Sequence, residues 1–370
     1  MTRLANEHGA INLAQGFPNF PAPDVLKEAA VQAIQADVNQ YAITWGTKRL
    51  RDALARKYAE WYGMEVDPEA EIVVTCGGTE AMASALLAIV DPGDEVIVFE
   101  PFYENYGPDA ILCGARPVYV PMPADRELDL DRLAAAFSPR TRAIIVCTPN
   151  NPTGRVLSRR ELEAIAELCR RHDAYAVTDE IYEHIYYEGQ HIPIATLDGM
   201  RDRTITISGA SKTFSVTGWR IGTIIAPRPA SDAIRKVHAF LTVGAPAPLQ
   251  EAVAVGLEQL PQSYYDGLAR DYRARRDVMH AALIAAGFQC VRPQGAYYIL
   301  ADFSALSDLP DDEFSAWLTK EAGVAPVPGS SFFSEPRLGR HLVRFAFCKT
   351  EDQLREAGER LATVRSRAGA

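Results

Sequence analysis

Charged side chains that could do chemistry together stand near the ends of apolar segments in the middle of the chain. Asp179 directly follows the apolar segment 174–178. Lys212 follows the apolar segment 204–208 after a short turn, and Arg220 lies eight residues further on. A buried carboxylate is costly to desolvate unless a cation or a hydrogen-bond donor meets it, and burial lowers the pKa of a lysine amine and makes it a nucleophile. These residue types predict a nucleophilic lysine with charged neighbours, although a structural ion pair would also account for Asp179.

Two polar turns add a candidate anion site and a pair of amides. The segment 71–76 runs into GGTE at residues 77–80, which opens a helical pattern. Glycines let the backbone approach a ligand closely, and a helix N-terminus offers free N–H groups to an anion; a plain helix cap is the alternative. The segment 143–148 ends in PNNPTG, whose prolines favour an extended loop that presents Asn150 and Asn151. An ordinary turn is again the alternative.

Taken together, these features suit one cofactor. Ligands of open parallel sheets bind at the carboxyl ends of the strands. An anion cradle, a carboxylate, a lysine and an arginine along that edge match a phosphate, a basic ring nitrogen and an aldehyde, as in pyridoxal 5′-phosphate (PLP). A dinucleotide is disfavoured because no G-x-G-x-x-G follows the first strand. No metal site is expected, since the six cysteines form no C-x-x-C pair and no Cys/His cluster at zinc spacing.

Short β-branched segments must position these residues. Most of them are apolar throughout, which is typical of strands buried on both faces. The candidates are 71–76, 95–99, 117–121, 143–148, 174–178, 204–208 and 222–226. Helical patterns lie between them, such as 158–171, which opens with a serine cap and a nearby acidic residue. We therefore predict an α/β fold with a mostly parallel seven-stranded sheet flanked by helices.

The end of the chain follows a different pattern. A long charged helix is expected over 263–286, stopped by Gly287. The later elements are a strand at 296–301, a helix at 311–322, a strand at 342–347 and a helix at 351–364. This order predicts a smaller α+β domain. We expect a large cofactor-binding domain over residues 27–265 and a small discontinuous domain made of residues 1–26 and 266–370.

The composition excludes several classes of protein. The 370 residues are 48% hydrophobic and 23% charged, and 38 basic against 48 acidic residues give a net charge of −10. This charge disfavours nucleic acid and anionic membrane as partners. No segment has the roughly 18–20 consecutive apolar residues that span a bilayer, and the N-terminus lacks the apolar core of a signal peptide. The scattered cysteines are predicted to be free thiols, as in a reducing compartment. We therefore expect a cytoplasmic protein.

The chain resembles class I and II aminotransferases of PLP fold type I along nearly its whole length. The resemblance is carried by INLAQGFPNF, NQYAITWG, GGTEA, EPFYENY, PNNPTG, DEIY, SGASKTFSVTGWRIG and LVRFAFCK. The segments EHGAINLAQGFPNF, NQYA and EPFYENY are most similar to the kynurenine, glutamine and methionine aminotransferase branch. Bacterial succinyldiaminopimelate aminotransferases have a similar pattern.

The resemblance implies roles around the cofactor. Lys212 would bind PLP covalently and then move a proton during the reaction. Asp179 would pair with the pyridinium nitrogen, which keeps the ring an electron sink. Tyr182 and Asn151 would hydrogen-bond the phenolic oxygen. Tyr103 would stack on the ring, although it could also be an ordinary core aromatic.

The resemblance also implies how the anionic groups are held. The backbone of Gly78 and Thr79 would bind the phosphate, with Arg220 as a charge-assisted clamp. Arg344 would bind the substrate α-carboxylate in a bidentate manner, and Gly16 would lie beside it.

Further implications concern the partner subunit and departures from the family pattern. Tyr41 would reach the phosphate of the partner subunit, so a homodimer with shared active sites is expected. Relatives often place a phosphate-binding serine where this chain has Gly209, so Ser208 or Ser211 would replace it, with Ser208 preferred. Gly244 stands at about the position where kynurenine-type relatives can carry a histidine in the pocket. We also expect a shorter N-terminal arm than in relatives.

The implied reaction is transamination in two half-reactions through pyridoxamine phosphate. The amino donor would be a methionine, glutamine, kynurenine or aromatic type of L-amino acid, and the acceptor a 2-oxo acid. The alternatives are a PLP-dependent β-lyase acting on cysteine conjugates, and a succinyldiaminopimelate or aspartate aminotransferase. A non-enzymatic PLP-sensing regulator is disfavoured by the net charge of −10, because such proteins carry a basic helix-turn-helix domain ahead of this fold.

Overall fold

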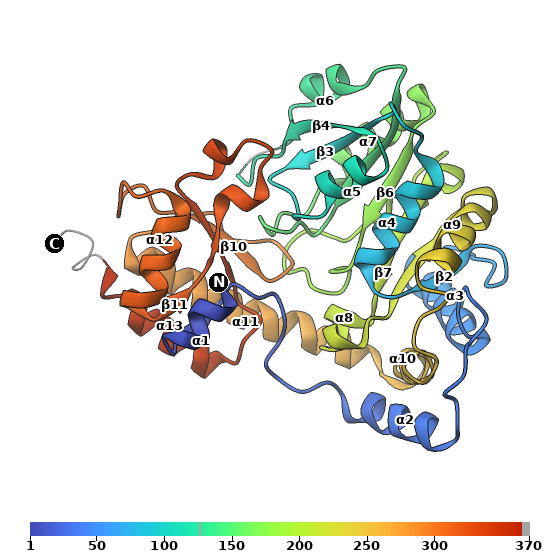
Figure 1. The fold of residues 1–370 in the computed structure, drawn as a ribbon, viewed down its shortest axis with the longest axis horizontal. Helices are drawn as coiled ribbons and strands as arrows, with labels where there is room; N and C mark the ends of the chain where they lie inside the picture. Colours follow the sequence, from blue (N-terminus) through green and yellow to red (C-terminus); the bar gives the residue numbers. More distant parts are fainter. Residues whose placement is uncertain (126, 365–370) are drawn as a thin grey trace.

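The computed structural model describes residues 1–125 and 127–364 and contains one large central sheet (Figure 1). Its seven strands lie in the order β2-β8-β7-β6-β5-β3-β4. They are β2 (Ile72–Thr75), β3 (Glu95–Glu100), β4 (Arg116–Pro121), β5 (Thr141–Cys147), β6 (Tyr175–Asp179), β7 (Thr204–Gly209) and β8 (Gly222–Ile225). Strands β3 to β7 pair in parallel, whereas β8 is antiparallel to both of its neighbours. The predicted mostly parallel seven-stranded sheet is confirmed.

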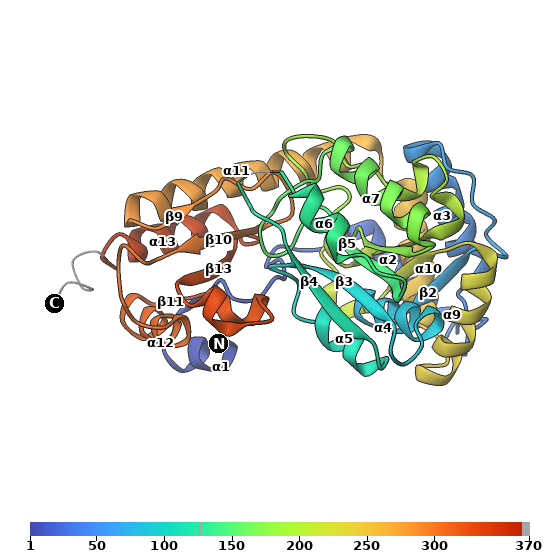
Figure 2. The same ribbon diagram turned by 90° about the horizontal axis from the view of Figure 1, so that it is seen from above.

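Helices cover both faces of this sheet, which explains why its strands are apolar throughout. Ala143 and Ile145 of β5 pack with helices α4 (Gly78–Ile89), α5 (Tyr106–Leu112) and α9 (Arg228–Leu241). The intervening Ile144 and Val146 pack on the other face with α6 (Leu130–Ala136) and α7 (Arg159–His172). Figure 2 shows these two layers of helices on opposite sides of the strands. Alternating side chains therefore all enter a core.

Two helix boundaries follow from local sequence chemistry. Helix α7 begins after Ser158, whose side chain accepts from the backbone N–H of Glu161 while the Glu161 carboxylate accepts in return from the Ser158 backbone N–H. This capping box satisfies N–H groups that the first turn leaves free. Helix α11 (Gln262–Ala286) ends at Gly287, which has a φ of 101°. Only glycine adopts that conformation at low cost.

The C-terminal part forms a second, smaller sheet in the order β12-β13-β10-β9. Its strands are β9 (Gln289–Cys290), β10 (Tyr298–Asp302), β12 (Val327–Pro328) and β13 (Leu342–Ala346). Helices α12 (Asp311–Trp317) and α13 (Glu351–Leu361) accompany them. The predicted helix 311–322 is α-helical only in its first half, since Leu318–Ala322 forms a π-helical turn that ends at Gly323.

The N-terminal segment packs with this C-terminal part rather than with the large sheet. Strand β1 (Ile11–Asn12) pairs in parallel with β11 (Val324–Ala325), and Leu13 belongs to the same hydrophobic core as Phe345. In Figure 1 the N-terminus lies beside the orange and red elements. This pairing fits a discontinuous small domain, and the exact division at residues 26/27 and 265/266 stays a prediction.

The remaining helices complete the fold around these sheets. They are α1 (Thr2–Glu7), α2 (Asp24–Gln35), α3 (Lys48–Tyr62), α8 (Ala210–Thr213) and α10 (Ala247–Gln259). Figure 2 shows α11 running from the C-terminal part along the large sheet. Within the described part of the chain, no helix combines the length and the apolar character needed to cross a membrane.

Candidate active site

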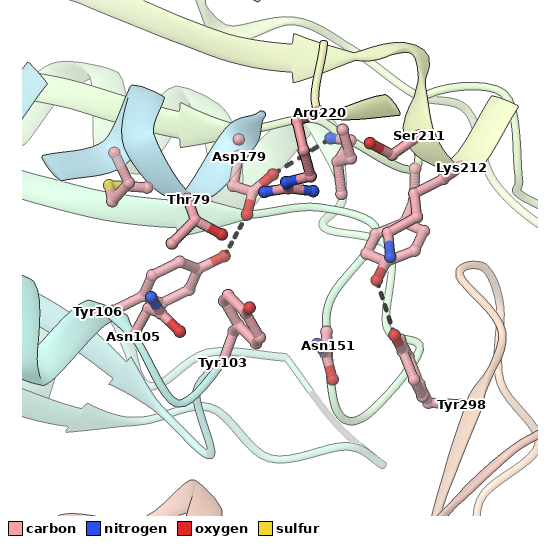
Figure 3. Close-up of a pocket in the computed structure, with 14 residues that line it drawn as sticks. Thr79, Tyr103, Asn105, Tyr106, Asn151, Asp179, Ser211, Lys212, Arg220 and Tyr298 are labelled. Atoms are coloured by element: carbon pink, nitrogen blue, oxygen red, sulfur yellow. Dashed lines mark hydrogen bonds between the residues drawn. The ribbon is translucent and has the colours of Figure 1, made fainter. Parts of the chain in front are cut away.

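A pocket lies at the carboxyl ends of the central strands, where the sequence predicted the site (Figure 3). It is lined by segments that follow β5, β6 and β7 and by the first turns of α4 and α5. The lining residues are Gly78, Thr79, Met82, Tyr103, Asn105, Tyr106, Asn151, Asp179, Ile181, Tyr182, Ser211, Lys212, Arg220 and Tyr298. Nine residues of the predicted site are among them. The topology brings them together because parallel strands end on the same edge.

The first turn of α4 and the side chain of Arg220 form an anion cradle. Gly77 precedes the helix with φ 86° and ψ 168°, and within the described part of the chain no side chain caps the helix N-terminus. A Cβ at Gly77 would lie 2.3 Å from an Arg220 terminal nitrogen, so glycine is what lets the guanidinium approach this backbone. Uncapped N–H groups and a guanidinium together suit a phosphate.

The carboxylate of Asp179 is buried at the end of β6. It accepts hydrogen bonds from the hydroxyl of Tyr106 at 2.6 Å and from the backbone N–H of Ile181 at 3.2 Å. Burial raises its pKa, and the Tyr106 hydrogen bond offsets part of that shift. Among the described residues, no basic side chain lies within ion-pair distance of Asp179. The structural ion pair that the sequence left open is therefore not found, and a protonated ring nitrogen would complete this site.

Lys212 lies in the short helix α8, directly after β7. Its amine donates to the backbone carbonyl of Gly16 at 3.1 Å and lies 5.7 Å from the centre of the Tyr297 ring. Burial lowers the pKa of Lys212 to about 8, and the nearby cations Arg220 and Arg344 add to this effect. A larger fraction of the amine is therefore neutral near pH 8 than for an exposed lysine.

The structure corrects the preference for Ser208 as a phosphate ligand. Ser208 lies outside the pocket, where its hydroxyl donates to the buried carboxylate of Glu183. Ser211 lines the pocket instead, because β7 ends at Gly209 and Ser211 lies in the following helix α8. Gly209 cannot carry a side chain, because a Cβ there would lie 2.6 Å from the carbonyl oxygen of Ile221. The close pairing of β7 with the start of β8 thus explains this departure from the family pattern.

Arg344 borders the pocket from β13. Its terminal nitrogens donate to the side-chain oxygen of Asn151 and to the carbonyl oxygen of Ala14, each at 2.9 Å. Its guanidinium lies 4.4 Å from the ring centre of Tyr298 and 4.8 Å from that of Phe332. The Nε atom is buried without a hydrogen-bond partner in the described part of the chain. A buried guanidinium with an unused donor suits a carboxylate ligand.

The other predicted residues fall into two groups. Tyr182 and Tyr103 lie in the pocket, where Tyr103 meets the ring of Tyr106 edge-on at 5.7 Å. Gly16 contributes its carbonyl to Lys212 and lies against the Tyr298 hydroxyl. Tyr41 lies outside this pocket and is 86% exposed. Its predicted role toward a partner subunit stays a prediction.

Tyr106 and Tyr298 line the pocket but were not predicted from the sequence. Tyr106 stands within the EPFYENY segment, three residues after Tyr103, so its position at the start of a helix was a usable signal. Tyr298 had no comparable signal. It pairs with Ala346 in the β10–β13 ladder, which puts it on the same face of the sheet as Arg344, two positions away. That neighbourhood depends on strand register.

The unsatisfied groups of the pocket fit PLP. The uncapped start of α4 with Arg220 matches its phosphate, and the buried carboxylate of Asp179 matches a protonated ring nitrogen. Lys212 offers an amine with a lowered pKa to an aldehyde. Arg344 retains a free donor for the carboxylate of a substrate. These donors and acceptors differ in chemistry, and each matches a different part of the cofactor or substrate.

Comparison with known proteins agrees with this chemistry. Residues 8–361 match the family described as aminotransferase class I and II. The chain is 39% identical over 393 residues to kynurenine–oxoglutarate transaminase 1 of Homo sapiens, covering 97% of this chain and 93% of that protein. It is also 39% identical over 363 residues to the methionine aminotransferase of Escherichia coli, covering 98% and 94%.

A solved structure gives the same result at the level of the fold. N-succinyldiaminopimelate aminotransferase from Mycobacterium tuberculosis matches with a TM-score of 0.95 at 42% identity, covering 98% of this chain and 96% of that chain. The central sheet and flanking helices are those of fold type I, and members of this family are generally PLP-dependent. The chain therefore belongs to the class I and II aminotransferase family and catalyses transamination between amino acids and 2-oxo acids.

Proposed function

We propose that this chain binds PLP in the pocket of Figure 3 and uses Lys212 as its catalytic lysine. The observation that carries the proposal is the buried amine of Lys212 in the same pocket as the carboxylate of Asp179, which has no ion-pair partner among the described residues. Within the described residues Lys212 forms no ion pair and donates to a backbone carbonyl, which does not offset the cost of burying a charged amine. A site that needs a neutral nucleophile accounts for the buried lysine.

Each side chain of the pocket would have its own role toward the cofactor ring or the substrate. PLP supplies, when bound, an aldehyde that exchanges amino groups and a ring that withdraws electrons. Asp179 would hold a proton on the ring nitrogen, and Lys212 would carry a proton to and from the substrate α-carbon. Tyr182 and Asn151 would hydrogen-bond the phenolic oxygen. Tyr103 would pack on the ring and exclude water.

The anionic ends of the ligands would be held separately. Gly78, Thr79 and Ser211 with Arg220 would bind the phosphate. Arg344 with Gly16 would bind the α-carboxylate, which the amino donor and the oxo-acid acceptor share. A single arginine can therefore serve both half-reactions.

We propose methionine, glutamine, kynurenine or aromatic amino acids as donors, with succinyldiaminopimelate and aspartate as alternatives. The similarity to kynurenine, methionine and succinyldiaminopimelate aminotransferases supports this range. Side-chain preference depends on a few pocket residues, whose substitutions change binding by only about 1–3 kcal/mol.

A spectral half-reaction screen tests the proposal. The purified protein is loaded with PLP and mixed with single amino acids, and loss of the visible cofactor absorbance ranks the donors. Lys212→Ala is expected to abolish this absorbance and the transamination. Normal absorbance and turnover in Lys212→Ala would overturn the site assignment. Release of pyruvate and ammonia from a cysteine conjugate, with no oxo acid present, would identify a β-lyase instead.

We also propose a cytoplasmic homodimer with shared active sites. Two neighbouring segments expose large apolar side chains, Tyr41 and Ile43 on one and Phe240 and Val243 on the other, with Phe240 93% exposed. The segments approach each other, since a Cβ at Gly244 would lie 3.8 Å from the carbonyl of Thr44. Contiguous exposed apolar side chains are typical of subunit interfaces.

A further inference from the structure

Tyr298 lines the pocket but has no role in the proposed function. Its hydroxyl lies 3.0 Å from the hydroxyl of Tyr182, an interaction marked by the dashed line at Tyr298 in Figure 3. Its ring centre lies 4.4 Å from the Arg344 guanidinium. Both tyrosines are buried. One side chain thus touches the residue assigned to the cofactor's phenolic oxygen and the residue assigned to the substrate carboxylate.

We propose that Tyr298 is a positioning residue with two separable parts. Its hydroxyl would orient the proton of Tyr182, and its ring would hold the guanidinium plane of Arg344. The inference rests on the proposed function, because the roles of Tyr182 and Arg344 come from it.

The hydroxyl part follows from counting protons. Each tyrosine hydroxyl has one proton, so the Tyr182–Tyr298 pair uses one in its mutual hydrogen bond and leaves the other free. In this structure Tyr182 donates to Tyr298. When Tyr182 instead donates to an anionic oxygen in the pocket, Tyr298 can donate to Tyr182. Such a chain strengthens the donor at its end, because each hydrogen bond polarises the next.

The buried setting keeps both hydroxyls protonated. Burial raises the pKa of Tyr182 and of Tyr298, so neither is a phenolate at neutral pH. The other titratable or charged groups that face this pair within the described residues include Tyr297, Arg344, Tyr103, Cys348, Cys147 and Asp179. None of them hydrogen-bonds the Tyr298 hydroxyl within the described residues. Tyr182 is therefore the partner through which this hydroxyl can act.

The ring part follows from the surroundings of Arg344. The guanidinium lies over the rings of both Tyr298 and Phe332, while Asn151 and Ala14 accept from its terminal nitrogens. Aromatic faces attract a guanidinium and restrict its plane. Gly16 makes this arrangement possible, since a Cβ there would lie 2.0 Å from the Tyr298 hydroxyl oxygen.

Tyr298→Phe tests the hydroxyl part, because it keeps the ring. The readout is the pH at which the visible absorbance of the bound cofactor changes. A hydrogen-bond donor to the phenolic oxygen stabilises the deprotonated form of the bound cofactor. A weaker donor therefore raises this pH midpoint, by roughly half a unit for the loss of one cooperative hydrogen bond. KM for the amino acid and for the oxo acid should stay within about twofold. An unchanged or lowered midpoint would overturn the hydroxyl part.

Tyr298→Leu tests the ring part. Loss of the aromatic face should raise KM for both the amino acid and the oxo acid by about tenfold relative to Tyr298→Phe. Equal KM values in the two variants would overturn this part. Thermal melting checks that each variant folds, and Tyr298→Met replaces the leucine variant if that one does not, because methionine fills irregular space.

Tyr272→Phe is the matched control. Tyr272 is buried in the same aromatic cluster and stacks on Tyr297, but its hydroxyl has no hydrogen-bond partner in the described part of the chain. It should leave the pH midpoint and both KM values unchanged. Failure of the proposed function would be recognised separately, since the parent protein would then show no visible absorbance with PLP.

Discussion

Lys212 lies in a pocket that Arg220 lines and Arg344 borders. Burial lowers its pKa to about 8, while Asp179 and Cys348 partly counteract the shift. The neutral amine is the form that attacks an aldehyde. We therefore expect the rate of PLP capture by the apoprotein to rise with pH, to be half-maximal near pH 8 and to level off above it. Stopped-flow absorbance measures this rate, and a rise that continues to about pH 10, as for an exposed lysine, would contradict the prediction.

Arg344 offers a second prediction at the scale of single residues. Lysine keeps the charge but cannot form two parallel hydrogen bonds to a carboxylate, so Arg344→Lys should raise KM for both substrates by roughly 30-fold. PLP content, measured from the visible absorbance, should not change. Arg292→Lys is the control, because Arg292 is an exposed residue that pairs with Asp277. A rise in KM for only one of the two substrates would argue against a carboxylate site shared by both half-reactions.

At the scale of elements, the start of α4 depends on Gly77. Alanine at this φ of 86° and ψ of 168° would cost about 1–3 kcal/mol of stability, because this backbone region is essentially restricted to glycine. Its Cβ would also meet the end of the Arg220 side chain at 2.3 Å, and this flexible end can move away. The clash should therefore displace the guanidinium rather than unfold the protein. We expect Gly77→Ala to weaken PLP binding by about tenfold, the loss of one charge-assisted hydrogen bond.

Gly93→Ala separates the backbone effect from the effect on Arg220. Gly93 has a similar φ of 96°, and a Cβ there would meet no atom within 4 Å. Both variants should lower the melting temperature, but only Gly77→Ala should raise the dissociation constant for PLP. An equal PLP affinity in the two variants would show that the cradle does not require Arg220 in its present place.

At the scale of the whole molecule, Tyr41 tests the shared active site. Its side chain is 86% exposed in the single chain. Tyr41→Phe keeps the aromatic ring that would pack in a dimer interface and removes only the hydroxyl, so it should not change the melting temperature of the apoprotein. In a dimer it should raise the dissociation constant for PLP roughly five- to tenfold, through loss of one hydrogen bond to a charged group. Absorbance titration at protein concentrations above and below the dissociation constant of the dimer gives the dissociation constant for PLP of the dimer and of the monomer.

Tyr175→Phe is the control for this prediction, because Tyr175 begins β6 at the end opposite Asp179. It should leave PLP affinity unchanged. A Tyr41→Phe protein that sediments as a dimer and binds PLP as the parent does would contradict the contribution of Tyr41. A monomeric parent with full PLP affinity would contradict the homodimer.

The sequence by itself determined most of the elements and the edge of the sheet that carries the site. Apolar segments, the Ser158–Glu161 cap and the stop at Gly287 are local signals, and local chemistry decides where an element begins and ends. Lys212 and Asp179 could be placed at one edge because parallel strands share the direction of their carboxyl ends. The motifs around them then indicated the family.

Tertiary structure decided which side chains face the pocket and which groups meet across it. Ser208 and Ser211 are equally polar in sequence, but strand geometry and the departure of the chain after β7 turn only Ser211 into the pocket. Tyr298 meets Arg344 through the register of β10 on β13, and Tyr182 through the packing of the small sheet against the end of β6. Register and side-chain direction are set by packing between distant segments, so no local pattern in the sequence contains them.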